Sequence, residues 1–154
     1  MKKRFFVIAH NIRSAYNVGS FFRTADALGV DRLILSGYTP TPDNHIKIAK
    51  TALGAERFVE WEQASQVGRV ISRLKKDGFE VVALERRKNS INLTEYRPVG
   101  QSVALILGNE IEGISKHVLL KSDQVVAIPM LGRKESLNVA VAFGIAGFFI
   151  TNRC

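Results

Sequence analysis

An α/β fold with a mostly parallel sheet flanked by helices is predicted by three features of the sequence. β-Rich apolar runs alternate with segments in which apolar residues recur every three or four positions. Several of these runs have no polar face, as is typical of strands covered by helices on both sides. Unusual polar loops follow the first, fifth and sixth runs, where loops should leave the carboxyl ends of the strands, and open α/β sheets bind ligands at this edge.

The strands are predicted from short apolar runs between turn-forming residues. They cover residues 4–9, 32–36, 57–61, 79–85, 102–107 and 124–129.

Two amphipathic helices are predicted between these strands. The first spans 16–29, and its apolar stripe consists of Val18, Phe21, Phe22, Ala25 and Leu28. The second spans 62–76, and its stripe consists of Ala64, Val67, Ile71 and Leu74. Gly78 follows the second helix, at a position where glycine commonly ends helices.

The last helix carries no charged residue between Val139 and Ile150, so it must be buried in the fold or against a second subunit. We expect Ser136 to cap this helix and Asn138 to lie in its first turn. Three small residues would let another helix pack closely, namely Ala140, Gly144 and Gly147. For so small a chain we favour a homodimer through this helix.

Length and composition indicate one domain over residues 1–154 with a basic surface. The chain has 22 basic and 14 acidic residues, and its net charge of +8 favours nucleic acid, although a basic surface alone is equally compatible with mere solubility. The only cysteine is Cys154, which excludes an internal disulfide and a cysteine-based metal site and suits a cytoplasmic location. No apolar run reaches the ~20 residues of a membrane span.

The loop after the first strand contains Asn17, Gly19 and Arg23, off the apolar stripe of its helix. Arg23 should reach back over Gly19 toward Asn17, and the glycine would leave room for a ligand. A helix start with an amide and a guanidinium suits a phosphate, but Asn17 could equally be a cap and Arg23 a solvated charge.

The loop after the fifth strand, GNEIEGIS, places Glu110 and Glu112 between Gly108 and Gly113. It could hold one acid inside a site, or its acids could only favour the start of a helix near Ser115. The chain lacks both a P-loop and a Gly-x-Gly-x-x-Gly motif, which disfavours nucleoside triphosphates and the usual dinucleotide mode.

Three motifs taken together resemble the SpoU (TrmH-type) RNA ribose methyltransferases of the SPOUT class. They are NVGSFFR (17–23), LILGNEIEGIS (105–115) and IPMLGRKESLNVAVA (128–142). The resemblance covers nearly the whole chain and implies a deep C-terminal trefoil knot, a rare exception to unthreaded chains. It also implies a homodimer and an S-adenosyl-L-methionine-dependent transfer of a methyl group to a ribose 2′-hydroxyl of tRNA or rRNA.

The resemblance also assigns roles to residues. The expected catalytic group is Asn17, Arg23, Glu110, Ser136 and Asn138, and the expected cofactor pocket is lined by Leu84, Gly108, Asn109, Ile128, Met130 and Leu137. Because a guanidinium keeps its proton, we expect Arg23 to grip phosphate and stabilise a developing alkoxide rather than to act as a base. Tyr16 and Tyr38 lie near strand ends and could stack on a base or simply pack at the rim.

Two other functions are compatible with parts of this pattern. One is an RNA-binding module of the same fold that has lost catalysis, which would not need the five polar residues together. The other is an α/β enzyme acting on a small anionic metabolite, which leaves the basic excess unexplained. Binding of both cofactor and RNA, of RNA alone, or of neither separates the three.

Overall fold

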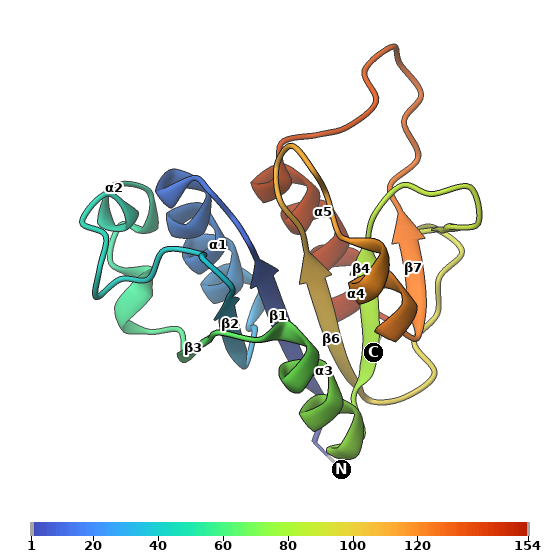
Figure 1. Ribbon diagram of the computed structural model, residues 1–154, viewed down its shortest axis with the longest axis horizontal. Helices are drawn as coiled ribbons and strands as arrows, with labels where there is room; N and C mark the ends of the chain where they lie inside the picture. The colour runs from blue at the N-terminus through green and yellow to red at the C-terminus, as the bar shows by residue number, and fades with distance from the viewer. Residues whose placement is uncertain (1, 154) are drawn as a thin grey trace.

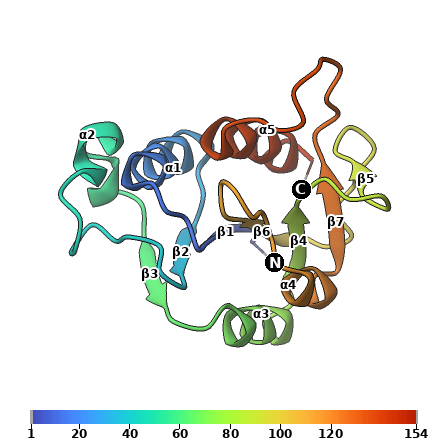
Figure 2. The same cartoon turned by 45° about the horizontal axis from the view of Figure 1, so that its top comes forward.

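The computed structural model describes residues 2–153 and has a single parallel sheet between two layers of helices (Figures 1 and 2). The sheet order is β3-β2-β1-β6-β4-β7-β5, and all the strand pairings described are parallel. The strands are β1 (Arg4–His10), β2 (Arg32–Ser36), β3 (Trp61–Ala64), β4 (Glu80–Leu84), β5 (Ile91–Asn92), β6 (Ser102–Leu107) and β7 (Gln124–Ala127). The predicted mostly parallel sheet flanked by helices is confirmed.

Helices α1 (Ala15–Leu28) and α5 (Val139–Thr151) cover one face of the sheet, and α3 (Val67–Lys76) and α4 (Lys116–Lys121) cover the other (Figure 2). Short α2 (Ile48–Ala52) and a 3₁₀ turn, η1 (Ala55–Arg57), pack beside α1. None of the helices within residues 2–153 is long and apolar enough to cross a membrane.

The sheet has one hydrophobic core on each face. Successive side chains of a central strand enter different cores, because they point to opposite faces of the sheet. On β1, Val7 packs into the core beneath α1 and α5, while Ile8 packs into the core beneath α3 and α4. All of β6 is buried, so the absence of a polar face in its sequence reflects cover on both sides.

The first predicted helix, 16–29, is confirmed as α1. Ser14 is its N-cap, with a side-chain oxygen that accepts a hydrogen bond from the Asn17 amide, and Gly29 ends it with a φ of 65°. Asn17 is therefore in the first turn rather than at the cap. The same helix lies along α5, since Phe21 meets Phe143 edge to face and Leu28 approaches Gly147.

The prediction of a strand at 57–61 is wrong. The amides of Phe58 and Val59 both donate to the Ala55 carbonyl in a turn, so they are unavailable to a sheet. Pairing with β2 begins only at Trp61 and continues through Ala64. Since residues 62–64 belong to β3, the helix predicted over 62–76 begins only at Val67, as α3.

Candidate active site

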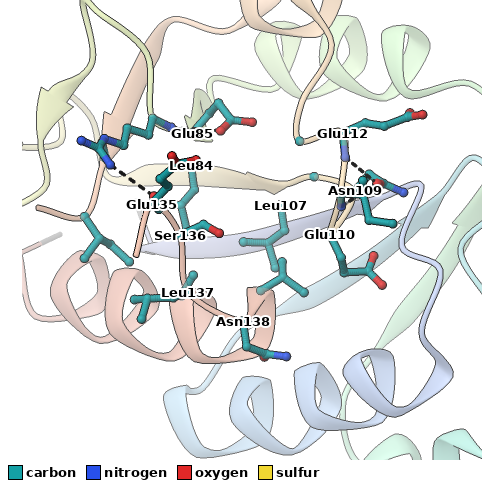
Figure 3. A pocket seen from close by; sticks show the side chains of 18 of the residues that line it. Leu84, Glu85, Leu107, Asn109, Glu110, Glu112, Glu135, Ser136, Leu137 and Asn138 are labelled. Carbon is teal, nitrogen blue, oxygen red and sulfur yellow. Dashed lines mark hydrogen bonds between the residues drawn. The ribbon is translucent and has the colours of Figure 1, made fainter. Parts of the chain in front are cut away.

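A cavity of about 480 Å³ opens at the carboxyl edge of β4, β6 and β7, within the size range of small-molecule sites. The segments that line it follow these three strands and lead into the start of α5 (Figure 3). Asn17 of α1 also lines the cavity. The strand register explains the convergence, because Ala83 lies opposite Ile106 and Leu84 lies opposite Val126. The cavity therefore occupies the edge of the sheet that the sequence predicted.

All the residues predicted to bind a cofactor line this cavity, namely Leu84, Gly108, Asn109, Ile128, Met130 and Leu137. Asn109, however, has its amide engaged by the protein. Its Nδ2 donates to the Asn11 carbonyl at 2.9 Å and to the Tyr38 hydroxyl at 2.8 Å, and its Oδ1 accepts from the amides of Ile111 and Glu112. Asn109 thus shapes the wall of the cavity, and its side chain fixes the loop.

Gly108 has no room for a side chain. A Cβ at this position would come within 2.8 Å of the Gly113 carbonyl carbon and of the Ile114 nitrogen. The loop therefore folds directly onto the backbone of Gly108, at the floor of the cavity.

Glu85 is a lining residue that the sequence reasoning missed. Its Oε2 accepts a hydrogen bond from the Ile114 amide at 2.7 Å, and its carboxylate occupies the space that a Cβ on Gly113 would need. Arg87 donates to the carbonyl of the same Ile114 at 3.2 Å. Residues after β4 thus hold the loop after β6. The only feature of the sequence that could have indicated this role for Glu85 is its place as an acidic residue at the end of a buried strand.

Four of the five predicted catalytic residues line the cavity: Asn17, Glu110, Ser136 and Asn138. The amide of Asn138 donates through Nδ2 to Asn17 Oδ1 at 3.2 Å, which joins residues 121 positions apart. Asn17 Nδ2 in turn lies 3.5 Å from Glu110 Oε2. Figure 3 shows Glu110 and Asn138 on opposite sides of the lower cavity, above α1.

The Glu110 carboxylate anchors the beginning of α1. Its Oε1 accepts from the Arg13 amide and its Oε2 from the Ser14 amide, each at 2.9 Å. Donors at a helix start favour a negative charge, so this contact fixes the helix that carries Asn17.

The expected cap of the last helix needs correction. Asn138, not Ser136, is the N-cap of α5, and its Oδ1 accepts from the amides of Ala140 and Val141. Ser136 lies two residues earlier, in the exposed segment between β7 and α5. An asparagine amide has both an acceptor and a donor, so Asn138 can cap α5 with Oδ1 while Nδ2 binds Asn17.

Arg23 does not line the cavity, and none of the hydrogen bonds described for Asn17 involves Arg23. Residues six apart on a helix point about 120° away from each other, which separates Arg23 from Asn17. Gly19 is buried, and a Cβ there would collide with the Ile48 carbonyl and the Thr51 hydroxyl of α2. The glycine therefore makes room for α2 and not for a ligand, while Arg23 remains exposed.

His10 ends β1 beside Ser36, with Nδ1 2.9 Å from the serine hydroxyl. Burial lowers the pKa of this histidine below its ordinary value of 6.5. The unfolded chain then binds more protons than the folded chain just below that value, so the free energy of unfolding should fall as the pH drops below about 6.5. Between about pH 7.5 and pH 5.5, urea denaturation should show that the free energy of unfolding falls less for His10→Gln than for the parent. An equal fall in both proteins would mean that other groups cause the pH dependence.

No group of three or more histidine, cysteine, aspartate or glutamate residues within 2–153 is arranged to hold a metal ion. The cavity itself is lined by apolar side chains, carboxylates and amides, together with the Ser136 hydroxyl and the guanidinium groups of Arg86 and Arg87.

The model of the SpoU rRNA methylase family matches residues 4–148. The chain belongs to this family. A tRNA (guanosine(18)-2′-O)-methyltransferase from Aquifex aeolicus is 32% identical to it over 145 residues, which are 94% of this chain and 67% of the relative. The chain spans only 54–67% of the length of the curated relatives, so it corresponds to part of those proteins.

Solved structures of SpoU methyltransferases share the whole fold. An AdoMet-bound rRNA methyltransferase from Sinorhizobium meliloti superposes with a TM-score of 0.87 at 27% identity, over 97% of this chain and 56% of that one. A structure from work on the 2-OH methylation of C/U34 on tRNA superposes with a TM-score of 0.84 at 27% identity, over 95% of this chain and 93% of that one. These solved structures match 95–97% of this chain, so the shared fold extends over nearly all of it.

Proposed function

We propose that this SpoU-family chain is an S-adenosyl-L-methionine-dependent methyltransferase that modifies a ribose 2′-hydroxyl of tRNA or rRNA. The observation that carries the proposal is the cavity in which all three family motifs meet. The names of the relatives support the reaction class, since one is a tRNA 2′-O-methyltransferase and one is an AdoMet-bound rRNA methyltransferase.

The cavity has the chemistry that this cofactor needs. Leu84, Ile128 and Met130 offer apolar surface to an adenine ring. Glu85 and Glu112 place negative charge near a ligand with a sulfonium and an ammonium group. The missing side chain of Gly108 lets the Gly113–Ile114 loop pack directly onto its backbone, which shapes the cavity wall.

The cofactor supplies an already activated methyl group, so the protein must align the reactants, exclude water and let a proton leave. The bond between the methyl carbon and sulfur would break as the bond between this carbon and the ribose 2′-oxygen forms. The proton of the 2′-hydroxyl would pass to a neighbouring basic group or to an RNA phosphate. Asn17 and Asn138, which are hydrogen-bonded to each other at the cavity, are positioned to orient the ribose. Glu110 holds the start of α1 in place, and this role accounts for both of its oxygens.

We also propose the homodimer, on a different surface from the one first expected. The small-residue face of α5 is used inside the chain, because Gly144 and Gly147 lie against Thr24 and Leu28 of α1. Val141 and Phe148 are instead 51% and 60% exposed, and with Ile145 they form an apolar stripe at helical spacing. With a second subunit on this stripe, the exposed Arg23 would act at the cavity of the partner subunit and not at the cavity of its own subunit.

The trefoil knot remains a proposal as well. It is supported by the way the end of α5 is held, since Arg153 donates from Nη1 to the carbonyls of Leu93, Thr94 and Tyr96. These carbonyls belong to the segment between β5 and β6, so a segment from earlier in the chain lies against the end of the last helix.

The function is tested by a transfer assay with methyl-labelled S-adenosyl-L-methionine and RNA from cells that lack this protein, followed by digestion to nucleosides. A labelled 2′-O-methylnucleoside is expected and would also identify the target. Cofactor binding without transfer to any RNA would contradict the proposed activity on free RNA. RNA binding without cofactor binding would favour the non-catalytic RNA-binding module.

A further inference from the structure

Tyr38 is an aromatic residue that is both exposed and anchored. It follows β2 by two residues, and 58% of its surface is exposed. Its hydroxyl nevertheless accepts a hydrogen bond from Asn109 Nδ2 at 2.8 Å, and its amide donates to Asn11 Oδ1 at 3.2 Å. Side chain and backbone are thus fixed at both ends while the ring remains open to solvent.

The backbone around Tyr38 adopts uncommon conformations to hold it there. Asn11 has a φ of 53°, which few non-glycine residues adopt, and Gly37 has a φ of 65°. A Cβ on Gly37 would collide with Asn11 Oδ1, the atom that accepts from the Tyr38 amide. Such local strain persists only where surrounding contacts enforce it, and it is frequent at ligand sites.

The anchor places the ring beside the cavity. Asn109 lines the cavity and also binds the Tyr38 hydroxyl and the Asn11 carbonyl. One buried amide therefore connects the loops after β1, β2 and β6 at the carboxyl edge of the sheet.

We propose that Tyr38 is a stacking site for a nucleobase of the RNA, beside the ribose that receives the methyl group. The inference rests on the proposed function and adds a residue that recognises the substrate. A ring with an anchored edge and a free face loses little conformational freedom when a base stacks on it. The net charge of +8 favours RNA over an uncharged aromatic ligand, because it also attracts the phosphates on either side of the base.

Three substitutions separate stacking from mere support of the loop. Tyr38→Leu removes the aromatic face, Tyr38→Phe keeps the face but loses the bond to Asn109, and Tyr38→Trp keeps a stacking surface. Phe58→Leu is the matched control, because Phe58 is also an exposed aromatic residue, at 78% exposure. It precedes β3 and so lies toward the amino ends of the strands, whereas Tyr38 lies at their carboxyl ends. Cofactor affinity, affinity for total cellular tRNA and rRNA, and KM for RNA are measured for each protein.

We expect Tyr38→Leu to weaken RNA binding and raise KM for RNA by roughly tenfold or more, with unchanged cofactor affinity. Tyr38→Phe and Tyr38→Trp should stay within about threefold of the parent, and Phe58→Leu should match it. Equal losses in Tyr38→Phe and Tyr38→Leu, together with weaker cofactor binding, would overturn the proposal in favour of loop support. Parent-like RNA affinity in Tyr38→Leu would also overturn it.

The outcome remains distinguishable from failure of the proposed function. If the parent binds RNA without methylating it, weaker RNA binding by Tyr38→Leu still supports the stacking site. If the parent methylates RNA and Tyr38→Leu does so with the same KM, only the stacking proposal fails. A parent that binds no RNA would overturn both.

Discussion

Replacing Arg23 with alanine should lower the rate of methyl transfer at saturating RNA by roughly 10²–10³-fold, the loss typical of removing one charge-stabilising donor. The residue is exposed and lies outside the cavity, and its side chain makes no hydrogen bond or ion pair with the part of the chain that the structure describes. Its loss should therefore leave both the unfolding temperature and the affinity for S-adenosyl-L-methionine unchanged. Single-turnover transfer with labelled cofactor, calorimetric binding and thermal unfolding measure the three quantities.

Two further variants decide what Arg23 does. Arg69→Ala removes an exposed arginine from α3, on the opposite face of the sheet, and should retain full activity. Arg23→Lys keeps the charge but loses the planar fork, so we expect it to remain strongly impaired. Transfer by Arg23→Lys at the parent's rate would show that charge alone suffices, and full activity of Arg23→Ala would remove Arg23 from the mechanism.

Replacing Gly108 with alanine should weaken cofactor binding by at least about tenfold and destabilise the protein by roughly 1–3 kcal/mol. The added Cβ would meet Ile114 Cγ1 at 2.5 Å and the backbone of Gly113 at 2.8 Å, so the loop over the cavity floor must move. That movement also strains the bond between Glu85 and the Ile114 amide. Isothermal titration with S-adenosyl-L-methionine and urea denaturation give the two values.

Gly100→Ala is the matched control for this change. Gly100 precedes β6 on the same chain segment, has no positive φ, and an added Cβ would find no heavy atom within 4 Å. It should bind cofactor like the parent. Undiminished binding by Gly108→Ala would mean that the loop adjusts freely and that Gly108 is not required by the cavity.

The sequence predicts the central part of this fold well because burial on both faces leaves a strong signal. β6 is apolar at each position but the first, and its predicted bounds, 102–107, are the observed ones. Residues 57–61 show the limit of this reasoning. Their β-rich apolar residues resemble a strand, yet the amides of Phe58 and Val59 bind the Ala55 carbonyl in a turn, and Phe58 is exposed. Short α2 and β5 contain too few residues for any period to emerge.

The site was predictable as a set of loops but not as a set of contacts. The motifs identify Asn17, Glu110 and Asn138, but only the fold shows that Glu110 binds two amides of the α1 start and that Asn138 is a cap. Glu85 escaped notice because its partners, Gly113 and Ile114, are distant in sequence and are contacted through the backbone. Backbone contacts leave almost no trace in residue type.

The bond between Asn17 and Asn138 has a consequence for how the protein matures during synthesis. α1 leaves the ribosome well before the amide that meets it, because 121 positions separate Asn17 from Asn138. β1 likewise waits for β6, with Arg4 beside Ser102, before it gains its second neighbour. Pairing of such distant segments is slow. A nascent chain therefore cannot complete the cavity until the start of α5 has been translated, because residues from Asn17 through Ala142 line it.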